Sequence, residues 1–318
     1  MSASSAAPAP FDDQNQSADI IIRSSDGVCF YVHKLIISQA SPIFHDMFLI
    51  PQPVSGDDEG FTKRPMVDMI EESKIWDIIL RICYPVPKPL VSCLHDIHAI
   101  LEAARKYQIE VVSQEMRRTL LLPLVLERHP CRVYALACIY NLPDIAQAAA
   151  RNTLHQPFLE DEAELPELVL MTGLQYHQLL QYRKKCQEVV ATLTALGPFW
   201  TWAGCHIVGG PVFGFGAIPP CTQCTKGTSR VGAQKIPEFI KQYVRSAAKV
   251  LEDTPYGAAV CTRPVLEPAM TSASRCDKCR EKSIGRILDI ATTFAKQIDD
   301  RLNEIKFPVT RDVRPSGH

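Results

Sequence analysis

The sequence predicts an α+β fold, in which a small sheet with flanking helices is followed by a mostly helical C-terminal half. Residues 20–22 and 28–32 are rich in β-branched and aromatic side chains and flank the turn Ser24–Gly27, a pattern typical of a β-hairpin. From residue 73 onward, apolar residues recur mainly at intervals of three and four, which is the period of amphipathic helices. The chain has 318 residues, enough for two domains.

The segment after the hairpin predicts a helix, a loop and a further strand. Ser41-Pro42 marks the start of the helix, because Pro is favoured at the first helical position. Phe44, Met47 and Phe48 then fall at i, i+3 and i+4, on one apolar face. Residues 51–60 are rich in Pro, Gly and acidic side chains and predict a loop, and residues 65–70 predict a strand.

This order of elements resembles the opening of a BTB/POZ domain. The family pattern has an Asp before the first strand, a Phe-x-x-His-Lys segment after the hairpin, a Ser-Pro-x-Phe helix start and a Met-Phe pair. The BTB-like motif residues of this chain are Asp19, Phe30, His33, Lys34, Ser41, Pro42, Phe44, Met47 and Phe48. The resemblance implies a protein-interaction module that forms a homodimer and has no catalytic activity of its own.

Further helices follow the BTB-like segment, and the later ones resemble the helical extension of fungal BTB proteins. We predict helices over residues 73–83, 94–108, 111–122, 132–140, 144–154, 166–171 and 174–196. Two longer amphipathic helices, over residues 236–251 and 284–305, are expected to be joined by a Pro-rich connection at residues 254–268. The predicted divisions of the chain are a disordered tail (1–16), a BTB/POZ-like domain (17–122), a helical extension (123–196), a Cys-rich helical module (197–307) and a loose tail (308–318).

Composition argues against several classes of partner. The formal net charge is −1, whereas a nucleic-acid-binding protein is expected to be basic. Apolar runs are too short to cross a membrane, and the first eighteen residues lack the basic start and apolar core of a secretory signal. We therefore expect an intracellular protein, in the cytoplasm or the nucleus, with no nucleic-acid or membrane partner.

Two Cys-x-x-Cys pairs predict one structural zinc site. Two residues between cysteines let both sulfur atoms face one metal ion, and two pairs complete a tetrahedral Cys₄ shell, which leaves no open position for catalysis. The alternative is four reduced thiols or a disulfide. The candidate ligands are Cys221, Cys224, Cys276 and Cys279, with Cys205, His206 and Cys261 as reserve ligands.

The sequence as a whole favours a non-enzymatic scaffold or adaptor that pairs with itself or with a related BTB chain and binds a further, unidentified protein. Phe44, Met47 and Phe48 are candidates for the dimer face, although some of them must serve the core. Asp19 is either part of a charged interface pocket, as in BTB dimers, or a solvated residue before a strand. The alternative function is substrate adaptor of a cullin-based ubiquitin ligase, but residues 49–53 lack the Glu of the hydrophobic-x-Glu element found in such adaptors. A transcriptional regulator or a zinc or thiol enzyme is a weaker alternative, and no catalytic residue is predicted.

Overall fold

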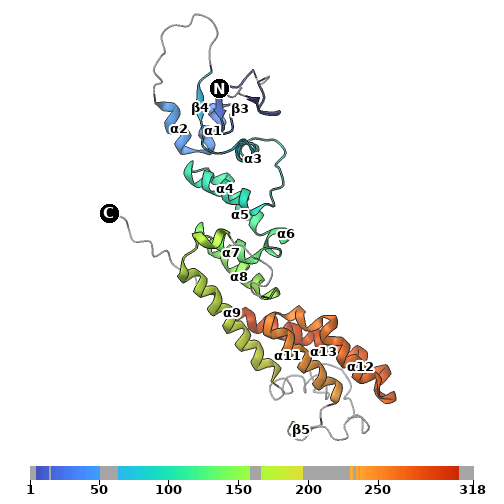
Figure 1. Ribbon diagram of the computed structural model, residues 1–318. Coiled ribbons are helices and arrows are strands. Elements are labelled where there is room, and N and C mark those ends of the chain that lie inside the picture. Colours follow the sequence, from blue (N-terminus) through green and yellow to red (C-terminus); the bar gives the residue numbers. More distant parts are fainter. Residues whose placement is uncertain are drawn as a thin grey trace, which may run out of the picture. The chain divides into compact units, whose positions relative to one another are not determined.

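The computed structural model describes residues 5–13, 16–50, 64–157, 166–195, 230–231, 234–235 and 237–307. The chain forms two compact units, residues 1–140 and residues 141–318. Figure 1 shows both units, coloured along the sequence from the N-terminus to the C-terminus. This division differs from the predicted boundaries after residues 122 and 196, because the first unit continues to residue 140 and the second contains helices from both sides of residue 196.

The first unit contains a four-stranded mixed sheet. Its strands are β1 (Ser5–Ala6), β2 (Ile20–Arg23), β3 (Val28–Val32) and β4 (Met66–Asp68), in the order β1-β3-β2-β4. β2 and β3 are antiparallel, which confirms the predicted hairpin, whereas β1 runs parallel to β3 and β4 runs parallel to β2.

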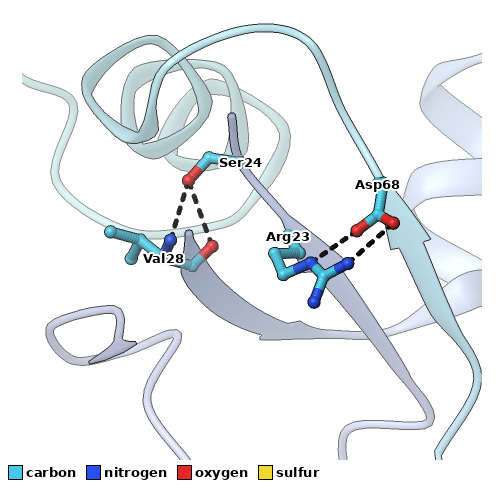
Figure 2. Close-up of polar contacts among 4 residues, drawn as sticks. All are labelled: Arg23, Ser24, Val28 and Asp68. Atoms are coloured by element: carbon cyan, nitrogen blue, oxygen red, sulfur yellow. Dashed lines mark hydrogen bonds and ion pairs between the residues drawn. The ribbon is translucent and has the colours of Figure 1, made fainter. Parts of the chain in front are cut away.

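The hairpin turn is closed by a glycine and a serine. Gly27 has φ +84°, a conformation that favours glycine, and its N–H donates to Ser24 O. The Ser24 hydroxyl donates to Val28 O and accepts from Val28 N, as Figure 2 shows. These bonds fix the register of the two strands.

Helices complete the first unit. They are α1 (Lys34–Ala40), α2 (Pro42–Leu49), α3 (Ser73–Cys83), α4 (Leu94–Lys106), α5 (Glu110–Leu120), α6 (Pro123–Leu126) and α7 (Pro130–Ile139). The α+β fold class is thereby confirmed, with β4 inside the predicted strand at residues 65–70. α3 has the predicted bounds, and at its start the Asp26 carboxylate of the hairpin turn accepts hydrogen bonds from Ser73 N and Oγ.

The N-terminal segment differs from the predicted disordered tail. Residues 5 and 6 form β1, and the side chain of Phe11 is 0% exposed, with ring centroids 6.3 Å from Phe30 and 5.1 Å from Tyr84. Phe11 O accepts from Tyr31 N, and Arg81 Nη2 donates to Ala9 O. One large aromatic ring and a few main-chain bonds therefore order a segment that is otherwise small and polar.

The second unit is helical, as the sequence predicts for the C-terminal half. Its elements are α8 (Pro143–Asn152), η1 (Thr153–His155), η2 (Pro166–Leu170), α9 (Gly173–Thr194), β5 (Arg230–Val231), β6 (Gln234–Lys235), α11 (Glu238–Asp253), η3 (Gly257–Cys261), α12 (Arg263–Ser274) and α13 (Asp277–Asn303). α9 packs against α11 and α13. α12 packs against the same two helices and against η3. The predicted boundary after residue 196 therefore runs between helices that share one core.

The predicted Pro-rich connection at residues 254–268 is wrong in its secondary structure. Residues 257–261 form η3, and α12 begins at Arg263 with Pro264 in its first turn, where the missing N–H has no intrahelical partner to lose. Pro268 lies inside α12. Tertiary packing of Val265, Ala269 and Ala273, all buried, offsets the local cost of that proline.

Candidate functional site

Asp19 connects the start of the sheet to the start of α1. Its Oδ1 accepts a hydrogen bond of 2.7 Å from the N–H of Lys34, the first residue of α1. Helix N-termini carry N–H groups without an intrahelical partner, and a carboxylate there also interacts favourably with the helix dipole. Asp19 itself is exposed, so one of its oxygens holds the helix while the group stays accessible from solvent.

His33 lies between the hairpin and α1 and is held by Tyr84. The His33 N–H donates to Tyr84 Oη at 2.8 Å, and His33 Nδ1 lies 3.2 Å from the same oxygen. His33 Nε2 lies 2.9 Å from Ser17 Oγ. Burial raises the pKa of Tyr84 to about 12, so the phenol stays protonated. His33 therefore connects the segment between β3 and α1 to Tyr84 and to Ser17.

Ser41 and Pro42 set the start of α2. Pro42 is the first helical residue, and the fully buried Ser41 hydroxyl accepts from Phe44 N at 3.1 Å. The same hydroxyl donates to Tyr107 O at 2.5 Å, at the end of α4. One side chain therefore caps α2 and fixes it to a residue 66 positions later.

Phe44 is a core residue. It is 1% exposed, and its ring lies 5.1 Å from Tyr107 and 6.0 Å from Trp76, between centroids. Met47 and Phe48 are half-buried, and Lys34 Nζ lies 5.9 Å from the centre of the Phe48 ring. Of the three residues predicted as candidates for a dimer face, Phe44 thus belongs to the core, as Phe30 of the hairpin also does.

The comparison with known families agrees with this geometry. Residues 10–122 match the family model of the BTB/POZ domain. The N-terminal part of the chain is a BTB/POZ domain. Domains of this family generally mediate protein–protein interaction and dimerisation, and they are interaction modules rather than enzymes. No curated protein gives a significant match to the chain.

The BTB/POZ domain exposes large apolar side chains on α1 and α2. Leu35 of α1 and Leu49 at the end of α2 are each 69% exposed, and Ile43 and Ile50 are also exposed. Ile43, Met47 and Ile50 follow one another at i, i+4 and i+7. We call the exposed aliphatic residues of α1, of α2 and of its C-cap, namely Leu35, Ile43, Leu49 and Ile50, the α1–α2 apolar surface. These four residues were not predicted for the dimer face, where the candidates were Phe44, Met47 and Phe48, although their apolar character is visible in the sequence.

Two carboxylates of the BTB/POZ domain have lowered pKa values. The Ser24 side chain, together with hydrogen bonds from Ser73 N and Oγ, lowers the pKa of Asp26 to about 2. Arg23 lowers the pKa of Asp68 through two hydrogen bonds of 2.6 and 2.8 Å, drawn in Figure 2.

The predicted zinc ligands fall mostly outside the described residues. Cys221 and Cys224 lie there, as do the reserve ligands Cys205 and His206. Cys276 is buried and is the N-cap residue of α13, and Cys279 lies in the first turn of that helix, with its side chain outside the described part. Within the residues that the structure describes, no three His, Cys, Asp or Glu side chains are grouped so as to hold a metal. The zinc site stays a prediction.

Two further predictions concern the cullin-adaptor element and membrane-spanning helices, and the structure describes only part of the residues that they involve. Of residues 49–53, where cullin adaptors carry a hydrophobic-x-Glu element, only Leu49 and Ile50 are described. In the part of the chain that the structure describes, no helix is both long and apolar enough to span a membrane.

Proposed function

We propose that this chain is a non-enzymatic scaffold or adaptor that forms a homodimer through the α1–α2 apolar surface of its BTB/POZ domain. One observation supports the proposal most strongly. The core of the domain is complete without Leu35, Leu49 and Ile50, since Phe44, Trp76 and Tyr107 fill the space beneath α2. Large apolar side chains that the core does not need are expected to be covered by a partner.

A second copy is the partner that fits this surface. The four residues of the α1–α2 apolar surface are aliphatic and carry no charge, whereas Gln39, His45 and Asp46 of the same two helices are exposed polar residues. A two-fold axis places the same apolar side chains on both sides of an interface, where uncharged aliphatic residues are mutually compatible.

Sedimentation velocity of the full-length chain tests the proposal. Leu35→Glu and Leu49→Glu each place a carboxylate in the proposed interface, and we expect either to raise the dimer dissociation constant at least tenfold, equivalent to about 1.4 kcal/mol. Leu90→Glu is the matched control, because Leu90 is at least as exposed and lies in the connection between α3 and α4. Equal dissociation constants for all three variants and the unmodified chain would contradict the proposal.

A further inference from the structure

The connection between α3 and α4 is rich in proline and exposed. It runs from Tyr84, the C-cap residue of α3, to Cys93, the N-cap residue of α4, with prolines at positions 85, 87 and 89. Four consecutive residues of this connection are exposed, namely Pro87, Lys88, Pro89 and Leu90. Leu90 is 76% exposed, so the connection displays a large aliphatic side chain beside two prolines.

The prolines restrict the backbone of residues 86–90, which we call the proline segment. The ring of Pro87 and that of Pro89 each fix φ at about −65°, and a residue that precedes a proline is excluded from the helical region, which applies to Val86 and Lys88. These are the dihedral angles of a polyproline II helix, which has no internal hydrogen bonds. Among the described residues, none forms a hydrogen bond with the backbone of residues 87–90, as expected for this conformation.

Both ends of the proline segment are fixed to the BTB/POZ domain. Before it, the Tyr84 ring lies 5.1 Å from Phe11 between centroids, the Tyr84 hydroxyl accepts from His33 N, and Val86 N donates to Tyr84 O. After it, Val91 is 6% exposed. A segment held at both ends loses less conformational entropy on binding than a free peptide, because much of its ordering has taken place on folding.

Lys88 determines which sides of the proline segment face outward. Its Nζ lies 2.9 Å from Glu115 Oε2 of α5. A polyproline II helix has three residues per turn, so residues three positions apart share an edge, and Lys88 occupies the edge directed toward α5. The other two edges each carry one proline and one aliphatic residue, namely Pro87 with Leu90 and Val86 with Pro89.

We propose that the proline segment binds a domain whose surface groove is lined by aromatic side chains and accepts polyproline II ligands, as the grooves of SH3, WW and EVH1 domains do. Two neighbouring apolar edges suit such a groove, because flat aromatic rings pack well against proline and aliphatic side chains. Pairing with a strand fits this segment poorly, since Pro87 and Pro89 have no N–H to donate to a ladder, and the same residues break a helix.

This inference rests on the adaptor role in the proposed function, for which it names the class of the further partner. It does not require the homodimer. The proline segment and the α1–α2 apolar surface have no residue in common, so binding to each can be removed separately.

Binding of the full-length chain to a panel of purified SH3, WW and EVH1 domains tests the proposal, followed by calorimetric titration of each domain that binds. We expect the double variant Pro87→Ala with Pro89→Ala to raise the dissociation constant at least tenfold, equivalent to about 1.4 kcal/mol. Pro166→Ala is the matched control, because Pro166 is an exposed proline of the second unit. Absence of binding to every domain of the panel even at millimolar concentration, or equal dissociation constants for the double variant and the unmodified chain, would overturn the proposal.

Leu90→Ala gives a second readout that leaves both prolines in place. We expect it to weaken binding by about tenfold, because Leu90 supplies the aliphatic half of one edge. The control is Leu124→Ala, since Leu124 of α6 is also an exposed leucine of the first unit. Equal binding by Leu90→Ala and Leu124→Ala would contradict the assignment of the edges.

Sedimentation velocity of the same proteins separates this inference from the homodimer. The double proline variant is expected to self-associate like the unmodified chain, and Leu49→Glu is expected to bind the domain like the unmodified chain. If Leu49→Glu leaves self-association unchanged while the double proline variant loses domain binding, the homodimer is wrong and the proline-segment contact stands. If Leu49→Glu reduces self-association while the double proline variant keeps full domain binding, the proline-segment contact is wrong and the homodimer stands.

Discussion

The two units of the chain are stabilised by different kinds of contact. In the BTB/POZ domain, single polar side chains connect distant segments: Asp19 holds the start of α1, Asp26 the start of α3, and Ser41 joins α2 to the end of α4. In the second unit, long helices pack through buried aliphatic and aromatic stripes, as in α11 and α13.

The two kinds of contact restrict the amino-acid sequence to different degrees. A polar side chain that must reach one particular N–H or carbonyl allows few substitutions. An apolar helix stripe accepts many residues of similar volume. The family match covers residues 10–122 and lies within the first unit.

The largest effect on stability is expected in the aromatic cluster of the BTB/POZ domain. Phe44→Ala removes a ring that contacts Phe48, Trp76 and Tyr107. We expect the free energy of unfolding to fall by about 3–5 kcal/mol, because the lost burial is accompanied by a cavity. Urea denaturation measures this, with Leu90→Ala as an exposed control that should change stability by less than about 0.5 kcal/mol. A similar small change for both would contradict the core assignment of Phe44.

An intermediate effect on the free energy of unfolding is expected at Arg183, a buried polar side chain of the second unit. Arg183 is 4% exposed and donates to the carbonyl oxygens of Thr153, Gln156 and Asp253. Arg183→Met keeps much of the packing and removes these donors, so we expect a loss of about 1–3 kcal/mol in the free energy of unfolding. The control is Arg301→Met, since the Arg301 side chain is half exposed and pairs with Glu304 on the surface. Equal effects of both substitutions would show that the buried donors contribute nothing.

The smallest effect on the free energy of unfolding is expected at Asp26, and this effect should depend on pH. Asp26→Ala removes the acceptor for Ser73 at the start of α3, and helix caps of this kind contribute about 1 kcal/mol. The pKa of Asp26 is lowered in the folded state, so its contribution is present above the unfolded pKa and disappears as the pH falls toward 2. The difference in unfolding free energy between the unmodified chain and Asp26→Ala should therefore shrink below pH 4. A difference independent of pH would rule out the charged cap.

The sequence predicted the α+β class, the hairpin and the helix start at Ser41, because turn chemistry and helical periodicity act over a few residues. It did not predict the ordering of residues 5–13, because a single Phe11 in a polar segment is ordered by Phe30 and Tyr84, which lie far along the chain. It also missed α12, since local rules treat Pro268 as a break and do not include the tertiary packing of α11 and α13 around it.

The candidate site shows the same limit. The motif residues Asp19, His33 and Ser41 could be found by spacing, but their roles follow from Lys34 N, Tyr84 Oη and Tyr107 O, which no local pattern specifies. Leu35 and Leu49 became candidates only through their exposure, since an apolar residue on a short helix has the same sequence signal whether it is buried or exposed.

The central claim is that the BTB/POZ domain presents the α1–α2 apolar surface to a second copy. Light scattering of the purified full-length chain after size-exclusion chromatography, at decreasing concentrations, tests it most directly when Leu49→Glu is measured alongside with Leu90→Glu as control. We expect a mass of at least two chains for the unmodified protein and for Leu90→Glu, and a lower mass for Leu49→Glu. A single-chain mass for the unmodified protein at all concentrations would contradict it.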